Sequence, residues 1–254
     1  MDFQIDKIYN EDCLEGMKRI ADGAVDCIIT DLPYGVLNRS NPDSQWDNVI
    51  PFEPLWEQFK RVTKENAAIV LFAQGMFTSD LMQSNRRMWR YNLVWDKVTR
   101  PTGFLNANNR PLRIHEDIVI FYEKQPTYNP QFTKGEFNHN RGCKGTYTNR
   151  TYGTFSAVNT ELTTDKHPRS IISIDKMSAE IVHPTQKPVD LLRYLILTYS
   201  NEGDTILDAT IGSGTTAVAA LMEHRHFIGF ETNKEYFDIA QGRIDQVRRN
   251  PTLF

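Results

Sequence analysis

Two carboxylates and a glycine turn near the carboxyl terminus have the types and spacing of a nucleoside-binding site. The apolar run Thr205–Leu207 is expected to be a short strand, and it ends in Asp208. The turn Gly212-Ser213-Gly214 follows and leads directly into an expected helix. Glycines there let a ligand approach the main chain, and the first N–H groups of the helix can donate hydrogen bonds to polar atoms. The next strand ends in Glu231, where a doubly wound nucleotide-binding fold places an acid for ribose hydroxyls.

The glycine spacing narrows the class of ligand. Ala217 stands where the third glycine of G-x-G-x-x-G would be, so a dinucleotide with a pyrophosphate is not favoured. A nucleoside without phosphate fits better, and S-adenosylmethionine is one. Asp208 would then bind its amino group and Glu231 its ribose. The simpler interpretation is a tight strand–helix turn followed by a surface glutamate.

A second candidate group follows the apolar run Val25–Thr30 (VDCIIT), which is expected to be a buried strand. The residues after it are Asp31, Leu32, Pro33, Tyr34 and Gly35. Proline stiffens such a turn, and glycine lets the chain leave it closely. Taken alone, this group is equally well explained as a turn that ends the strand.

The elements around these groups alternate between strand and helix. The sequence predicts helices over 54–64, 77–89, 188–199, 213–223 and 234–247, and further strands over 67–73, 91–95, 118–122 and 227–230. Continuous apolar strands separated by helices are typical of a mostly parallel sheet covered on both faces. We therefore expect a doubly wound α/β fold.

The stretch 125–176 breaks this pattern. It has little periodicity, and its cations are interleaved with aromatic residues, as on surfaces that bind phosphates and stack bases. A solvated loop with a few packed aromatic side chains is the competing interpretation. The candidate cations for nucleic-acid contact are Lys134, Arg141, Lys144 and Arg150.

Composition sets outer limits on the class of protein. The chain has 254 residues and a formal net charge of −3, which suits one large domain or a domain with an insertion and does not by itself indicate a nucleic-acid partner. Its three cysteines are sparse and include no C-x-x-C, so no metal site is expected. Neither a secretory leader nor a membrane span is expected, and the cytoplasm is the expected compartment.

Four segments resemble the beta group of DNA amino-methyltransferases. Asp31–Tyr34 is similar to their D-P-P-Y motif, and DATIGSGTT at 208–216 to their cofactor loop D-P-F-x-G-S-G-T-T. HPTQKP at 183–188 and HEDIVIF at 115–121 are similar to two further shared segments. The order of the motifs is that of the beta group, and the resemblance covers nearly the whole chain. It implies a Rossmann-like methyltransferase domain over 1–124 and 177–254, with a target-recognition region inserted at 125–176.

The resemblance implies methyl transfer from S-adenosylmethionine to the N6 amine of an adenine that is flipped out of double-stranded DNA. Asp31 Oδ and the Leu32 carbonyl would accept hydrogen bonds from that amine, which localises its lone pair and stabilises the positive charge that develops. Pro33 would stiffen the turn, and Tyr34 would stack on the base. No covalent intermediate is needed, so no cysteine has to act as a nucleophile.

The remaining expected contacts also follow from the resemblance. Asp12 and Cys13 would bracket the adenine of the cofactor, although Asp12 is also explained as a helix cap. Trp46 and Asp47 lie in the loop after the acidic turn, where Trp46 would either contact DNA or pack as an anchor. The full expected cofactor set is Asp12, Cys13, Asp31, Gln186, Lys187, Asp208, Ala209, Gly212, Ser213, Gly214, Thr215, Glu231 and Thr232.

Three residues depart from the family pattern. Leu32 replaces a proline whose contribution is its carbonyl, which leucine also has, while Ala209 and Thr210 replace a Pro-Phe pair and imply a looser fit around the cofactor. Three alternatives remain: transfer to cytosine N4, transfer to RNA, and a binding subunit that has lost catalysis. The sequence does not decide whether a cognate restriction endonuclease exists as a partner. The resemblance implies that a homodimer is possible, because relatives often pair as dimers, but no interface can be identified in the sequence.

Overall fold

The computed structural model describes residues 4–36, 47–137, 146–151, 153–156, 163–175 and 186–250. The expected DNA contacts Trp46, Arg141 and Lys144 lie outside these ranges. The chain forms two compact units, one made of Met1–Asn129 and Ser170–Phe254 and the other of Pro130–Arg169. No helix in the described ranges is long and apolar enough to cross a membrane.

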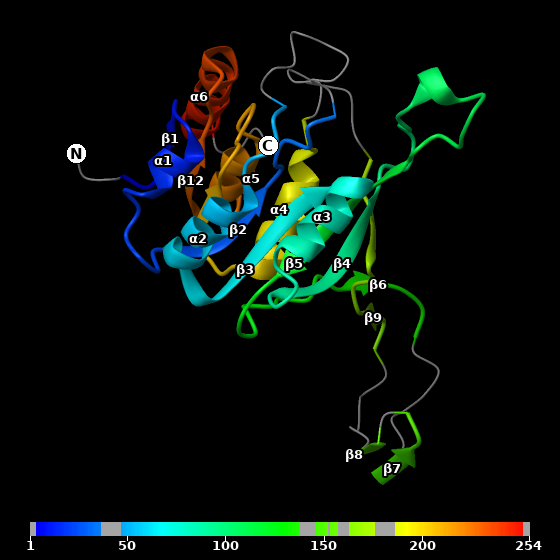
Figure 1. The fold of residues 1–254 in the computed structure, drawn as a ribbon. Helices are drawn as coiled ribbons and strands as arrows, with labels where there is room; N and C mark the ends of the chain where they lie inside the picture. Colours follow the sequence, from blue (N-terminus) through cyan, green and yellow to red (C-terminus); the bar gives the residue numbers. More distant parts are fainter. Residues whose placement is uncertain are drawn as a thin grey trace. The chain divides into compact units, whose positions relative to one another are not determined.

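An eight-stranded sheet forms the centre of the first unit (Figure 1). Its order is β1-β12-β11-β2-β3-β5-β4-β10, and every neighbouring pair is parallel except the two that β5 makes with β3 and β4. The mostly parallel α/β fold expected from the sequence is therefore confirmed. The strands are β1 Lys7–Tyr9, β2 Val25–Thr30, β3 Thr63–Ala73, β4 Trp89–Asp96, β5 His115–Phe121, β10 Ile171–Ser173, β11 Thr205–Asp208 and β12 His226–Phe230.

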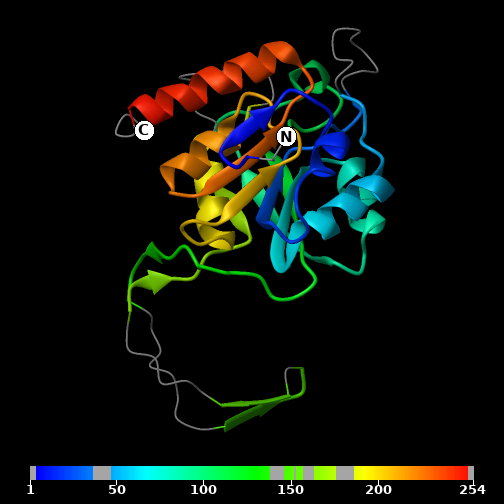
Figure 2. The same ribbon diagram turned by 90° about the vertical axis from the view of Figure 1, so that its left-hand side faces the viewer.

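Helices cover both faces of this sheet, as the period-two alternation of β3 requires. Ala68, Val70 and Phe72 pack into one apolar cluster together with α4 and α5, whereas Ile69 and Leu71 pack into a second cluster with α1 and α2. β1, the first strand of the chain, lies at one edge of the sheet and pairs with β12, the last strand (Figure 2). The helices are α1 Cys13–Met17, α2 Phe52–Val62, α3 Met76–Ser84, α4 Val189–Tyr199, α5 Thr215–Met222 and α6 Lys234–Arg249, and one 3-10 turn, η2, spans Phe104–Asn106.

Three elements differ most from the expected boundaries. β3 begins at Thr63 rather than at residue 67, because its first four residues are not buried and carry no apolar signal. α3 ends at Ser84, five residues before the expected end, and Asn85 after it has a non-helical backbone. β10 lies inside the stretch expected to be irregular and joins the central sheet beside β4; its three residues are too few to show a period.

The second unit contains two short antiparallel ladders. β6 Thr133–Lys134 pairs with β9 Asp165–Lys166, and β7 Thr146–Asn149 pairs with β8 Gly153–Ser156. Lys134 makes an exposed ion pair with Asp165. Arg150 is exposed in the turn between β7 and β8.

Candidate active site

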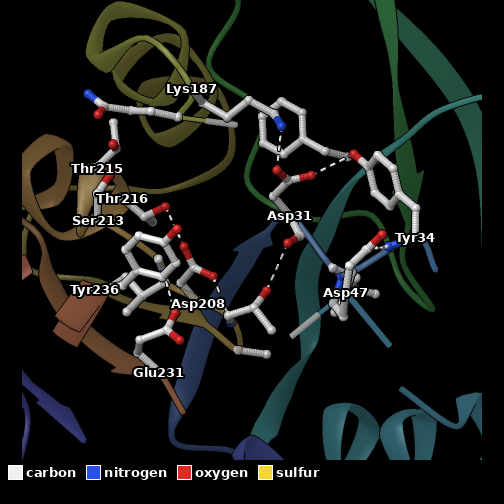
Figure 3. A pocket seen from close by; sticks show the side chains of 18 of the residues that line it. Asp31, Tyr34, Asp47, Lys187, Asp208, Ser213, Thr215, Thr216, Glu231 and Tyr236 are labelled. Atoms are coloured by element: carbon white, nitrogen blue, oxygen red, sulfur yellow. Dashed lines mark hydrogen bonds and ion pairs between the residues drawn. The ribbon is translucent and has the colours of Figure 1, made fainter. Parts of the chain in front are cut away.

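A cavity of about 570 Å³ lies where several strands end. Asp31 and Tyr34 follow β2, Asp208 ends β11 and Glu231 follows β12, and all four line this cavity (Figure 3). The two residue groups singled out in the sequence therefore share one site. The expected residues found in its lining are Asp12, Cys13, Asp31, Leu32, Pro33, Tyr34, Gln186, Lys187, Asp208, Ala209, Gly212, Ser213, Thr215, Glu231 and Thr232.

Both oxygens of the Asp31 carboxylate have partners. The Tyr34 hydroxyl donates to Oδ1 at 2.5 Å, and Lys187 Nζ donates to Oδ2 (Figure 3). Burial raises the pKa of Asp31 above its usual value, although Lys187 opposes the shift. For Lys187, burial favours the neutral amine, but Asp31 and Glu116 outweigh it and raise the pKa. Lys187 is thus held as a cation against Asp31.

The ion pair continues inward as a chain of four charges, Asp31, Lys187, Glu116 and Lys97, which we call the ionic tetrad. Glu116 Oε2 lies 3.2 Å from Lys187 Nζ, and its Oε1 lies 2.5 Å from Lys97 Nζ. Burial favours a neutral Glu116, yet Lys187 and Lys97 together lower its pKa to about 2. Lys97 and Lys187 are buried, Asp31 and Glu116 are partly buried, and the four charges sum to zero, so each charge depends on the others for its compensation.

Asp47 holds the acidic turn in shape from outside the motif. Its Oδ1 accepts hydrogen bonds from the N–H groups of Tyr34 at 2.8 Å and Gly35 at 3.0 Å, and its Oδ2 accepts from Val36 at 2.8 Å. Asp47 is 2% exposed, and Gly35 has a positive φ of 69° that glycine adopts without strain. The sequence placed Asp47 only in the following loop, because no motif spacing predicts its hydrogen bonds to the main chain of the acidic turn.

Asp208 is the buried acid of the opposite wall. It is 4% exposed, and it accepts hydrogen bonds from the Thr216 hydroxyl at 2.6 Å and from Thr210 N–H at 3.1 Å. Burial raises its pKa from 3.8 to about 6. A cationic amino group placed against it would relieve this cost of burying the charge.

Glu231 lies at the end of the next strand. Its carboxylate accepts from Gly212 N–H at 2.9 Å and from Asn233 N–H at 2.7 Å, which orients it at the cavity wall. Each oxygen keeps a second lone pair for a hydroxyl donor. Gly212 has φ +53°, and a Cβ there would meet nothing within 4 Å, so the main chain at this position is open to a ligand.

Gly214 has a different surrounding from Gly212. It has φ +81°, and a Cβ there would lie 2.9 Å from the Cβ of Ala240 on α6. It is absent from the cavity lining among the described residues. Its position is explained by the left-handed start of α5 and by close packing of α5 on α6.

Asp12 caps the short helix α1, with Oδ1 accepting from Leu14 N–H at 2.8 Å and from Glu15 N–H at 3.2 Å. Because it also lines the cavity, the cap and a ligand contact are compatible. Burial raises the pKa of the neighbouring Cys13 thiol to about 12, so this thiol is protonated at neutral pH and is no nucleophile.

Thr210, one of the departures from the family pattern, joins the two halves of the site. Its hydroxyl donates to the Asp31 carbonyl at 2.9 Å and lies 3.0 Å from the Thr30 hydroxyl. Phenylalanine at this position would make neither contact. The sequence shows the departure but indicates no role for the Thr210 hydroxyl, for Lys97 or for the charge of Glu116.

Residues 25–242 match the model of a DNA methylase family whose members methylate N6 or N4 amino groups. This chain belongs to that family. Its sequence is 27% identical to the Type II methyltransferase M.HinfI of Haemophilus influenzae over 277 residues, which cover 97% of this chain and 70% of the relative. The beta-group assignment from the sequence is therefore confirmed.

The solved structures of relatives agree with the observed fold. A complex of M1.HpyAVI with S-adenosylmethionine matches at a TM-score of 0.62, with 24% identity and coverage of 94% of this chain and 98% of the other. The cytosine-N4-specific PvuII DNA methyltransferase matches at 0.67, with 14% identity over 96% and 90%. The cofactor expectation, S-adenosylmethionine, is confirmed for this family. The choice between adenine and cytosine is open, because the family includes both.

Proposed function

We propose that this protein is a site-specific DNA methyltransferase that acts on the N6 amine of adenine. The observation that carries the proposal is the shared cavity, in which Asp31 stands on one wall and Asp208 and Glu231 stand on the other. An acceptor for an amine is thereby brought next to a site suited to a nucleoside that carries an amino group. The preference for adenine rests on Asp31 itself, because relatives that act on cytosine N4 more often begin this motif with serine.

The residues of the cavity suit S-adenosylmethionine. Asp208 offers a buried carboxylate to the amino group, Glu231 offers its carboxylate to the ribose, and the open main chain at Gly212 admits the molecule closely. S-adenosylmethionine supplies an electrophilic methyl group on a sulfonium. Positioning the amine in line with that methyl group is then the main task of the protein.

Asp31 and Leu32 act on the other reactant. An exocyclic N6 is a weak nucleophile because its lone pair is delocalised into the ring. Asp31 Oδ1 has a lone pair left beside the Tyr34 hydroxyl, so it can accept one amine hydrogen, and the Leu32 carbonyl accepts the other. These two acceptors stabilise the positive charge on nitrogen as the methyl group arrives. The carboxylate is able to take the surplus proton afterwards.

Nucleoside analysis of DNA treated with the purified protein and S-adenosylmethionine tests the proposal. N6-methyladenine is expected in the digest, and long-read sequencing of a methylation-free host that expresses the protein then gives the sequence context. N4-methylcytosine would replace the adenine assignment with the second specificity of the family. Methyl transfer to RNA alone would reject DNA as the substrate, and absence of any methylated product would favour a binding subunit.

A further inference from the structure

The connection between β4 and β5, residues 98–114, carries an unusual surface that we call the β4–β5 loop. Phe104 and Leu105 at its tip are 76% and 84% exposed, the largest values among the large apolar side chains that the structure describes. The loop contains Arg100, Arg110 and Arg113 and no acidic residue, although the whole chain has a net charge of −3. An apolar tip on a basic stem has no explanation in the packing of the core.

The loop is an ordered projection. Thr102 and Arg113 exchange main-chain hydrogen bonds of 2.7 and 3.0 Å at its base, and η2 forms its tip, standing clear of the sheet (Figure 1). These bonds hold Phe104 and Leu105 away from the body of the first unit. Removing two such apolar side chains from water is energetically favourable, so their exposure here indicates a binding partner that covers them.

The base of the loop adjoins the active-site cavity. β4 ends at Asp96, which pairs with His115, the first residue of β5. β3 and β4 are both antiparallel to β5 and therefore run in the same direction. The loop thus leaves the sheet at the end where β3 also finishes. Lys97, just before the loop, and Thr102, near its start, line the same cavity as Asp31. A molecule that delivers a base to Asp31 would therefore pass close to this loop.

We propose that Phe104 and Leu105 insert into the base stack of double-stranded DNA beside the target, while Arg100 and Arg110 contact neighbouring phosphates. The inference rests on the proposed function, because a base drawn into the cavity leaves its stack interrupted. Apolar side chains are the usual wedge at such a step, and they offset the cost of unstacking. A second copy of this chain is a poorer occupant, because a two-fold contact centred on this loop would bring its arginines against one another.

The double variant Phe104→Ala/Leu105→Ala tests the wedge on duplexes that carry the site found by sequencing. One duplex has the target base paired, and the other has it mispaired, which lowers the cost of extrusion. We expect the methylation rate to fall at least about tenfold on the paired duplex and to return close to the wild-type rate on the mispaired one. Ile5→Ala, which removes a 49% exposed side chain near β1, is the matched control and should leave both rates unchanged.

The arginines are tested by the salt dependence of binding to the paired duplex. Arg110→Gln should weaken binding and reduce the slope of log K against log salt by about one unit. Arg86→Gln is the control. Arg86 is an exposed arginine just before the start of β4, at the end of the strand opposite to the loop, so its substitution should leave the slope unchanged.

Three outcomes would overturn the wedge. The first is wild-type activity of the double variant on the paired duplex, and the second is an equal loss on both duplexes. The third is conversion of a dimer to a monomer, measured by sedimentation, with an unchanged ratio of the two rates, which would assign the tip to a second copy. Failure of the proposed function looks different, because the wild-type protein would then methylate neither duplex.

Discussion

Asp31 must meet two requirements that conflict in a partly buried site. It must present an oxygen to an incoming amine, and it must remain ionised while burial favours the protonated acid. Lys187 supports the ionised form from one side, and the Tyr34 hydroxyl orients the carboxylate from the other. The carboxylate is therefore set in position before the base arrives, which is the condition for electrostatic catalysis.

Asp31→Asn should lower the methylation rate by about 10²–10³-fold, the usual effect of removing one preorganised group that stabilises the transition state. The amide nitrogen, a hydrogen-bond donor, would also face another donor, either Lys187 Nζ or the Tyr34 hydroxyl, and the negative charge that pairs with Lys187 would be lost. Binding of S-adenosylmethionine, measured by calorimetry, should persist, because Asp208 and Glu231 are untouched. A variant that still turns over at the wild-type rate would exclude the acceptor role.

Asp208→Asn should stabilise the fold but weaken the binding of S-adenosylmethionine. The pKa of Asp208 in the folded protein, about 6, lies above its ordinary 3.8, so the folded state binds this proton more tightly than the unfolded chain does. The carboxyl therefore costs no stability below about pH 4, costs more as the pH rises to about 6, and costs up to about 3 kcal/mol above that. The substitution removes this cost.

We expect Asp208→Asn to raise Tm at pH 8 by about 5 °C, with a smaller gain at pH 4.5. Its Kd for S-adenosylmethionine should rise at least about tenfold, because the amino group loses an ionic partner. Melting curves at the two pH values and calorimetric titrations measure the two effects. A lower Tm at pH 8 would show that the buried charge is compensated within the protein alone.

At the scale of elements, Gly214 at the start of α5 is explained by its left-handed backbone and by the close packing of α5 on α6. Gly214 and Gly203 have nearly the same φ, +81° and +82°, but a Cβ at Gly203 would meet nothing within 4 Å, whereas one at Gly214 would collide with Ala240. Gly203→Ala should therefore cost about 1 kcal/mol of backbone strain. Gly214→Ala should cost at least about 1 kcal/mol more for the contact. Urea unfolding of both variants measures the difference, and equal losses would contradict the packing account.

The ends of β4 and β5 carry the inner half of the ionic tetrad. Glu116→Gln leaves Lys97 and Lys187 buried with only Asp31 to balance them, so it should lower the free energy of unfolding by about 3–5 kcal/mol. Adding Lys97→Met restores neutrality, and the double variant should be more stable than Glu116→Gln alone. Strictly additive losses in this cycle would show that the two side chains do not compensate each other.

The sequence predicted elements well where burial makes a pattern. The strands β2, β11 and β12 lie within a residue of their expected limits, because their apolar runs are continuous. The antiparallel direction of β5 and the strand β10 were not predicted. The direction of β5 depends on how the β4–β5 loop returns to the sheet. The three residues of β10 are too few to show a periodic pattern.

At the scale of the whole molecule, a net charge of −3 coexists with a proposed DNA partner, so the cations that bind phosphates must be local. In the second unit, Arg150 is exposed at the turn between β7 and β8, while Lys134 is paired with Asp165. Arg150→Ala should reduce the salt slope of DNA binding by about 0.9, and Lys134→Ala should reduce it by less. Fluorescence anisotropy over a salt series measures both, and unchanged slopes would remove these residues from the interface.

The site was predicted to the extent that its residues lie in contiguous motifs. Asp208 ends a strand, Asp31 and Glu231 each directly follow one, and the carboxyl ends of parallel strands meet at one edge of a sheet. Asp47, Lys97 and Glu116 reach the same site through contacts over long stretches of chain, and no local spacing records such contacts. Their contribution is visible only when the fold brings the segments together.

The grip of Asp47 on Tyr34, Gly35 and Val36 fixes both ends of the segment 37–46 at one point. The entropy of closing a chain segment grows only slowly with its length. We therefore expect changes in the length of the segment between residues 36 and 47 to leave the acidic turn in place, as long as Asp47 is kept.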